Sequence, residues 1–264
     1  MERIGKSLRN PAKDTILSGV AENQVGIGFA FGLQEALDQL GALAGPLIFA
    51  LVFFMTSQDG IPEYQLSYKL LFIPFVLLML FVAYAYRSIR QNNLISDIKK
   101  KEFRSERLQP IFWIYTAFTF FCTLRFVNFS IIGYHLKANN LMSDGNITLL
   151  YSVAMAVDAV AALLAGKAYD RMKKEMKTGG LAILMAIPFI TLLLPFMIIS
   201  SSITLIVIGM VIFGVVMGTH ETIMRSAIAD ITPFHKRGTS YGVFNANYGL
   251  ALLIGSALMG WLAV

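Results

Sequence analysis

The stretch GIGFAFGLQEALDQLGALAGP, residues 26–46, decides how the chain is interpreted. It is an apolar segment of helical length in which glycines recur and two carboxylates, Glu35 and Asp38, stand among aliphatic side chains. A second version, GTSYGVFNANYGLALLIGSA at 238–257, follows near the C-terminus with its glycines and aromatic residues in matching positions. Internal repeats of hydrophobic helices are typical of secondary transporters, so this pairing predicts two related halves.

The composition is that of a polytopic membrane protein. Of 264 residues, 56% are hydrophobic and 14% charged, well above the apolar share of an ordinary soluble domain. The net charge of +6 arises from Lys and Arg in short connections, which is a topology signal and gives no reason to expect nucleic acid as a partner. Cys122 is the only cysteine, so a disulfide framework within the chain and a multi-cysteine metal site are excluded, and we expect no metal and no cofactor.

Seven segments are long and apolar enough to span a bilayer, which takes about 20 helical residues. They are residues 28–55, 67–88, 109–134, 147–168, 179–199, 203–229 and 239–263. Residues 2–20 are an eighth segment, but hydropathy alone does not identify it as a span because it carries Arg3, Lys6, Arg9 and Lys13. The expected fold is an all-α, polytopic helical bundle.

Basic residues gather in two connections, residues 87–107 and 166–177, which we therefore expect on the cytoplasmic side. The intervening connections at 56–67 and 135–146 are poor in Lys and Arg and are expected outside. With this orientation a spanning segment 2–20 would start outside. Either that segment does not insert, or further helices precede Met1.

Two motifs carry a resemblance to the major facilitator superfamily. The segment GKAYDRMKK at 166–174 places Asp170 and Arg171 after a glycine and before a basic cluster, and it resembles the loop signature of that superfamily. The segment LGALAGP at 40–46 resembles the glycine-proline motif in the fifth helix of its antiporters, although Phe49 and Ala50 stand where a glycine pair is usual. GKSLRNPAKD, before it, is similar to a fourth-helix signature in one branch.

On the superfamily's twelve-helix plan, the chain matches about the fourth to the eleventh helix, that is, about 8 of 12 in two pseudo-repeated halves. The resemblance implies the end of a first bundle at 1–90, a central cytoplasmic loop at 91–108 and a second bundle without its last helix at 109–264. We therefore expect a transporter fragment whose missing N-terminal helices are encoded upstream or on another chain, and which does not transport alone.

Charged residues in the first hairpin are expected to pair. Counting along antiparallel helices at 1.5 Å per residue puts Lys13 and Glu35 roughly 10 Å from the cytoplasmic end and Arg9 and Asp38 roughly 16 Å from it. Since intramembrane ions are costly unless paired, the sequence predicts Lys13–Glu35 and Arg9–Asp38 pairs. They form either a coupling network or a structural pair that lets the helix insert.

Asp158 is the first candidate for a proton or substrate site, because it stands among small residues that allow close helix packing. Arg125 lies at a similar expected depth, so the alternative is a structural Arg125–Asp158 bridge. On a later helix, Glu221 and Arg225 stand at i and i+4 in the favourable order, and His220 beside them titrates near neutral pH when unperturbed.

Glycines and a proline are expected to allow close approach of helices that rock during alternating access. This packing set is Gly28, Gly32, Gly41, Gly45, Pro46, Gly242 and Gly255. The resemblance also implies a gating loop at Gly166, Asp170 and Arg171, in which Asp170 packs against the helix start near Gly26 to Gly28 and stabilises the state closed to the cytoplasm.

These features predict a secondary active transporter of a small solute, in the plasma membrane and coupled to protons, acting as an efflux antiporter. One alternative is uptake of an anionic or sugar-like solute with Arg9, Lys13 and Arg125 as its contacts. The other is a non-transporting membrane protein, such as an assembly partner. No nucleophile and base stand in helical register, so the sequence does not indicate an enzyme.

Overall fold

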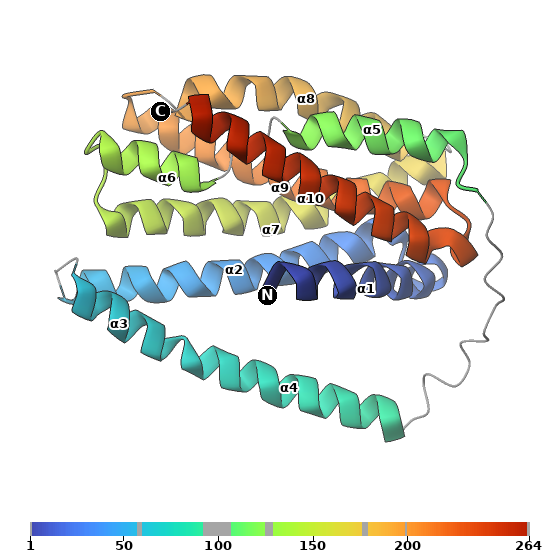
Figure 1. Ribbon diagram of the computed structural model, residues 1–264, viewed down its shortest axis with the longest axis horizontal. Helices are drawn as coiled ribbons and strands as arrows, with labels where there is room; N and C mark the ends of the chain where they lie inside the picture. Colours follow the sequence, from blue (N-terminus) through green and yellow to red (C-terminus); the bar gives the residue numbers. More distant parts are fainter. Residues whose placement is uncertain are drawn as a thin grey trace.

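A computed structural model describes residues 2–56, 60–91, 107–124, 129–175, 179–198 and 200–262. Within these ranges the regular elements are helices, which confirms the all-α expectation for the described residues. In chain order (Figure 1) they are α1 (Glu2–Gln24), α2 (Ile27–Thr56), α3 (Ile61–Leu70), α4 (Phe72–Gln91), α5 (Pro110–Leu124), α6 (Phe129–Ala138), α7 (Asp144–Glu175), α8 (Gly179–Ile198), α9 (Ile203–Ile231), the 3-10 turn η1 (Phe234–Lys236) and α10 (Arg237–Leu262).

Helical stretches of membrane-spanning length and apolarity confirm a multi-pass membrane protein. There are five such stretches among the described residues: Ile27–Thr56, Ile61–Ser88, Asp144–Glu175, Gly180–Ile198 and Ile203–Ile231. Large apolar side chains such as Phe81 and Phe189 are exposed on their outer faces. Lipid chains accept such side chains at no cost, so the exposed faces fit a bilayer environment.

Two expected spans differ from the structure. Residues 109–134 form two shorter helices, α5 and α6, with 125–128 outside the described residues. The expected span 239–263 is a continuous helix, α10, but it falls short of the apolarity of the five stretches because polar groups such as Asn245 and Asn247 interrupt it.

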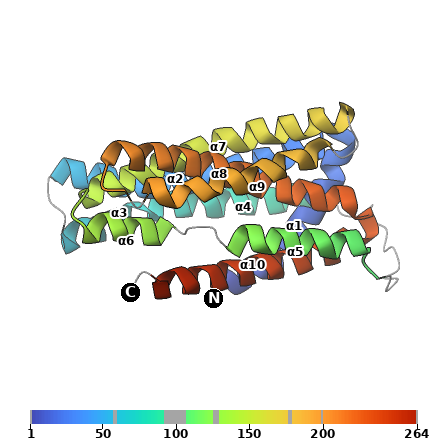
Figure 2. The ribbon, with the colours of Figure 1, turned by 90° about the horizontal axis from the view of Figure 1, so that it is seen from above.

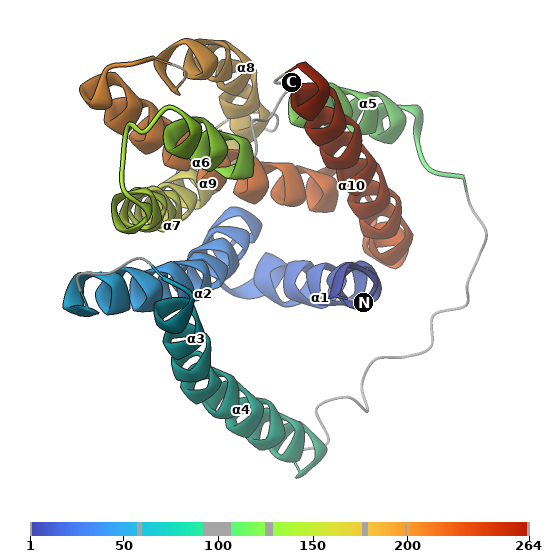
Figure 3. The same cartoon turned by 60° about the vertical axis from the view of Figure 1, so that its left-hand side comes forward.

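The helices mostly run side by side along the long axis of the molecule (Figure 1). α2 lies along α7, and α9 packs against both. α1 lies along α10, which also packs against α5, as the view from above shows (Figure 2). α4 diverges from the bundle and continues from α3 alone (Figures 1 and 3). The helices before and after residues 92–106 therefore meet where α2 packs on α7 and α9 and where α1 packs on α10.

Glycines make the α2–α7 seam close. A Cβ on Gly28 would meet the backbone oxygen of Gly166, and a Cβ on Gly166 would meet that of Gly28. One turn further along, a Cβ on Gly32 would lie 2.5 Å from the backbone oxygen of Ala162. Because real side chains cannot approach this closely, only glycine at these positions lets the two backbones come into contact.

The structure shows close packing for part of the expected glycine set and no close neighbour among the described residues for the rest. Gly255 faces the backbone of Leu124 in α5, so it allows the same kind of close approach. A Cβ on Gly41, Gly45 or Gly242 would meet no described atom within 4 Å. Those positions lie where α2 and α10 have no close neighbour among the described residues, and sequence alone does not locate the neighbour. Pro46 stands inside α2 without ending it.

Candidate functional site

Arg225 of α9 is the centre of a buried charge network. Its Nη1 donates to Glu35 Oε2 of α2 over 2.9 Å, and its Nη2 donates to Glu221 Oε2, one turn earlier in α9, also over 2.9 Å. The Arg225 side chain is 16% exposed and that of Glu35 is 4% exposed. Separating such groups would leave a charge buried without compensation, which typically costs about 3–5 kcal/mol. The network therefore ties α2 to α9.

Neutral groups complete the network around the three charges. Tyr248 of α10 donates its hydroxyl to Glu221 Oε1 over 3.1 Å, and Gln39 of α2 donates its amide to Glu35 Oε1 over 2.8 Å. With the amide of Gln34 oriented to satisfy its neighbours, its oxygen accepts from Arg225 Nη1 at 3.2 Å and from Lys13 Nζ at 2.7 Å. The network thus extends from α9 and α10 through α2 to α1.

The predicted pairing within the first hairpin is wrong. Glu35 pairs with Arg225, and Lys13 pairs with Asp38 at 3.6 Å in place of Arg9. α1 continues to Gln24, so Lys13 lies eleven residues from the end of its helix, level with Asp38 eleven residues from Ile27. The first helix ends about one helical turn later than expected, at Gln24 and not at residue 20. Each residue of α1 therefore lies about one turn further from the end of the hairpin than the sequence predicted. Arg9 is exposed.

Asp158 lies on α7 against α9 and is 0% exposed. Neither carboxylate oxygen has a hydrogen-bond partner, and the carboxyl lies beside Gly218 of α9, where a Cβ would come within 2.7 Å of Oδ1. Its electrostatic neighbours are Glu35, Glu221 and Arg225. A buried carboxyl without hydrogen bonds is costly to ionise, so the geometry keeps Asp158 the first candidate for a proton site. The predicted partner Arg125 lies outside the described residues.

His220 is buried on α9 beside the network, with its ring centroid 6.4 Å from that of Tyr248. Asn245 lines a small cavity together with Arg225 and Tyr248, and its amide donates to Asp14 Oδ2 of α1 over 3.4 Å. Asp14 is 1% exposed and was not selected from the sequence. Asp14 follows Lys13 in a segment whose charges are mostly basic, and no pattern there distinguishes a buried carboxylate from a solvated one.

The expected contact of Asp170 with the start of α2 is present, near the C-terminal end of α7. Backbone N–H groups of Gly28 and Phe29 donate to its Oδ1 and Oδ2 over 2.8 and 2.7 Å. These groups belong to the first turn of α2, where backbone N–H groups have no partner within the helix. Gly26 precedes them with φ +98°, and a Cβ there would also meet Asp170 Oδ2, so two independent constraints require glycine.

The other two residues of the predicted gating loop have different positions. Gly166 faces Gly28 across the seam, as described above. Arg171 is exposed and pairs with Glu175 at 3.8 Å, one turn away on its own helix. The structure therefore joins Gly166 and Asp170 to α2 and leaves Arg171 outside that contact.

The Major Facilitator Superfamily profile matches residues 3–256. The chain belongs to the Major Facilitator Superfamily. Its relatives include uncharacterized proteins of Mycobacterium bovis and Mycobacterium tuberculosis, each 32% identical over 266 residues. The match covers 99% of this chain and 62% of each relative, so the chain spans less than two thirds of their length. No solved structure gives a significant match.

The chain also contains a second buried arginine, Arg237, which the sequence did not indicate as a site residue. Arg237 pairs with Glu22 of α1 at 2.9 Å and donates to the backbone oxygens of Ala229, Ser18 and Thr232. Its side chain is 4% exposed. In the sequence it belongs to the basic run HKR, which resembles an ordinary solvated loop, so no local signal separates it from His235 and Lys236.

Among the described residues of the superfamily chain, no group of three or more His, Cys, Asp or Glu side chains is placed to hold a metal ion. The polar centre consists instead of carboxylates with two cations, Lys13 and Arg225.

Proposed function

We propose that the protein is a secondary active transporter, or part of one, that moves a small solute by alternating access and couples this movement to protons. Membership of the superfamily supports transport. The observation that carries the coupling is the buried, unpartnered carboxyl of Asp158 next to the Glu35–Arg225–Glu221 network. A proton leaving Asp158 would create a charge that competes for Arg225 and so would weaken the link between α9 and α2.

The charge balance of the centre favours a cationic solute and export in exchange for protons. Four buried or partly buried carboxyl groups and one exposed one, Asp38, face two cations there, and both cations are engaged by acidic or amide side chains. The acidic members are Asp14, Glu35, Asp38, Asp158 and Glu221. An anionic or sugar-like solute, the second candidate, would need Arg9, Lys13 or Arg125 as contacts, and Lys13 is already paired with Asp38. The plasma membrane is the proposed location.

Flux in proteoliposomes tests this function. The chain would be reconstituted alone and together with the segments of the Mycobacterium tuberculosis relative that lie outside the matched region. We expect a pH gradient to drive movement of the cationic dye ethidium only in the complemented preparation, and Asp158→Asn to abolish it. The matched control Glu175→Gln, an exposed acid on the same helix, should retain flux. Absence of flux in both preparations would favour the non-transporting alternative.

The protonation of Asp158 is tested separately by infrared spectroscopy on the 264-residue chain. A neutral carboxyl gives a carbonyl stretch that is distinct from the carboxylate bands. We expect such a band in the wild type at neutral pH and its loss in Asp158→Asn. A wild type without this band would contradict the proton-carrying role, whether or not the chain transports.

A further inference from the structure

A groove follows the outer side of α7, between α8 and α9. Its volume is about 760 Å³, and apart from Thr219 its lining is apolar. The residues that α7 contributes include Val153, Ala156, Val160, Leu164, Ala168 and Met172. At 1.5 Å per residue, the stretch from Val153 to Met172 is about 28 Å long, close to the thickness of a bilayer's hydrocarbon core.

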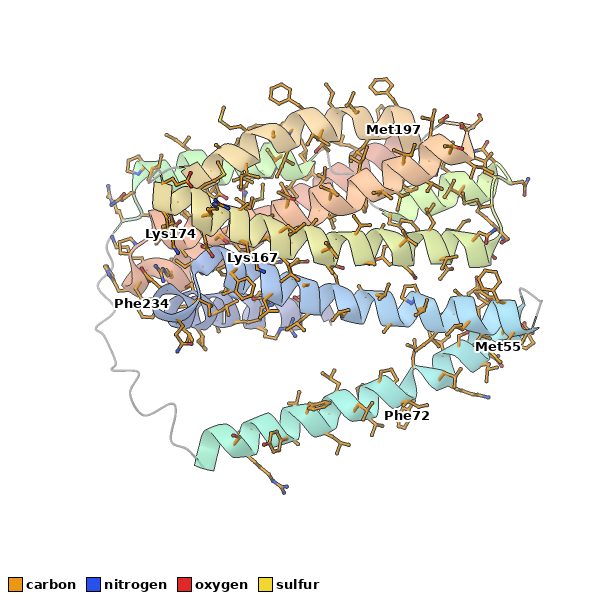
Figure 4. All side chains as sticks on the ribbon, turned by 180° about the vertical axis from the view of Figure 1, so that it is seen from behind. Met55, Phe72, Lys167, Lys174, Met197 and Phe234 are labelled. Atoms are coloured by element: carbon orange, nitrogen blue, oxygen red, sulfur yellow. The ribbon has the colours of Figure 1, made fainter. Side chains whose placement is uncertain are left out.

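A second cavity lies at the end of this groove and is cationic. Its volume is about 370 Å³, and Lys167, Arg171 and Lys174 line it together with Val25, Phe29 and Asp170. Figure 4 shows Lys167 and Lys174 at the same end of α7, far from Met55 and Met197 at the other end of the bundle. The basic surplus of this connection is what predicts a cytoplasmic location.

Residues that line the two cavities interleave along the last turns of α7. Arg171 stands three residues after Ala168 and seven after Leu164, so these side chains lie on the same face of the helix. Lys167 follows Val160 and Leu164 by the same intervals. A molecule with one anionic end and one apolar chain would therefore contact both cavities at once.

The acidic residues nearby, Asp170 and Glu175, offset only part of the charge of Lys167, Arg171 and Lys174. Both oxygens of Asp170 are engaged by backbone N–H groups of α2. Glu175 is the partner of Arg171 at 3.8 Å, but the two side chains are 70% and 84% exposed, and ion pairs so exposed to water are weak. Lys167 also lies over the ring of Phe29, with its nitrogen 5.5 Å from the centroid, which holds it at the cavity.

We propose that this surface binds an anionic phospholipid of the cytoplasmic leaflet. The phosphate lies against Lys167, Arg171 and Lys174, and one acyl chain lies in the apolar groove. One leaflet contributes about half of the hydrocarbon core, roughly 15 Å or ten residues of helix, so the chain would reach from Arg171 to about Ala161. A free phosphate shares the headgroup chemistry but leaves the groove unused. The site does not depend on transport activity.

Native mass spectrometry of the purified 264-residue chain tests this site. The chain in detergent receives equal amounts of phosphatidylglycerol and phosphatidylcholine of the same chain length. We expect phosphatidylglycerol to be retained about tenfold more strongly. The double variant Arg171→Gln/Lys174→Gln should lose that preference, whereas Lys236→Gln, a cytoplasmic cation outside the cavity, should keep it. Equal retention of the two lipids by the wild type would overturn the proposal.

The groove is tested by filling it. Val160→Phe should reduce phosphatidylglycerol retention about fourfold, the equivalent of one CH₂ group losing its apolar contact. The control Leu192→Phe introduces the same ring at an exposed position of α8 outside the groove and should have no effect. Glycerophosphoglycerol, which has the headgroup without acyl chains, and inorganic phosphate should not displace the lipid. Displacement by either compound, or equal effects of the two Phe variants, would show an anion site without a lipid groove and contradict the proposal.

Discussion

The two halves of α2 contain similar glycines and meet very different surroundings. In the first half, Gly28 and Gly32 face the backbone of α7, and Glu35 pairs with Arg225 of α9. In the second half, Gly41 and Gly45 have no described atom within 4 Å of a Cβ. There α2 meets α7 through aromatic side chains, with the ring of Phe54 near Gly145. The same residue type therefore allows close contact at one end and has no described neighbour to contact at the other.

Polar links between the two groups of helices gather at the end where the glycines are in contact. Asp170 joins α7 to α2, and Arg237 joins α10 to Glu22 of α1. Within the later group, Tyr169 and Lys173 of α7 both donate to Asp230 of α9 at this same end. If this end is cytoplasmic, as the basic connections predict, the structure has the links that an alternating-access transporter needs to close its inner side.

Removing Arg225, the central cation of the buried network, should cause the largest loss of stability. Arg225→Leu leaves Glu35 and Glu221 buried without their partner, so we expect the free energy of unfolding to fall by about 3–5 kcal/mol. Denaturant unfolding in detergent measures this. Lys137→Leu, which removes the exposed pair with Asp144 outside this network, should cost no more than about 1 kcal/mol. Equal losses in the two variants would show that the Arg225 network stabilises the fold no more than an exposed ion pair does.

Adding a side chain to the seam should have the next largest effect. Gly28→Val places carbon atoms against the backbone of Gly166, and overpacking of this kind costs about 1–3 kcal/mol. Gly41→Val, in the open half of the same helix, is the matched control and should change the stability little. Thermal unfolding of the two variants in the same detergent compares them. A loss in Gly41→Val as large as in Gly28→Val would mean that a helix covers Gly41 in solution.

Weakening the link at the helix start should have a smaller effect on stability. Asp170→Asn removes the charge that interacts with the first turn of α2, worth about 0.3–1 kcal/mol when exposed and up to about 2 kcal/mol when partly buried. We expect greater accessibility of the inner end to thiol reagents, measured on a cysteine introduced at Ala21. Glu175→Gln is the control, since among the described residues its carboxylate pairs with Arg171 of its own helix and not with α2. Unchanged accessibility in Asp170→Asn would make Asp170 an ordinary surface charge.

Labelling across the membrane assigns the two ends without changing stability. Ser105 belongs to the basic connection and lies outside the described residues. A cysteine at this position should react with an impermeant reagent only after the cells are permeabilised, because the positive-inside rule places this connection in the cytoplasm. Reaction in intact cells would reverse the orientation and the assignment of the inner end.

Sequence reasoning identified the helices and the superfamily because hydropathy, loop charge and the GKAYDRMKK motif are local signals. It also placed Asp170 at the start of α2, since the motif carries that contact with it. It did not identify the partner of Glu35, because 190 residues separate it from Arg225 and only the packing of α2 on α9 brings the two together. Helix depth alone could not select among several cations at similar levels.

Burial of single polar residues was equally hidden from sequence. Arg237 and Asp14 are nearly inaccessible, yet each stands in a stretch with other charges. The fold decides which charge of a run is enclosed, because that depends on where α1 lies on α10. Gly41 and Gly242 show the converse, since their spacing indicates a contact that the described helices do not make.

Pulsed electron paramagnetic resonance tests most directly whether Asp170 holds the inner end closed. Spin labels at Val25 and Glu175 in a Cys122→Ala background report the distance between the start of α2 and the end of α7, and labels at Met55 and Asn146 report the other end. We predict one narrow, short distance for the Val25–Glu175 pair in the wild type and an additional, longer distance in Asp170→Asn. Identical distributions in the wild type and the variant would contradict the account.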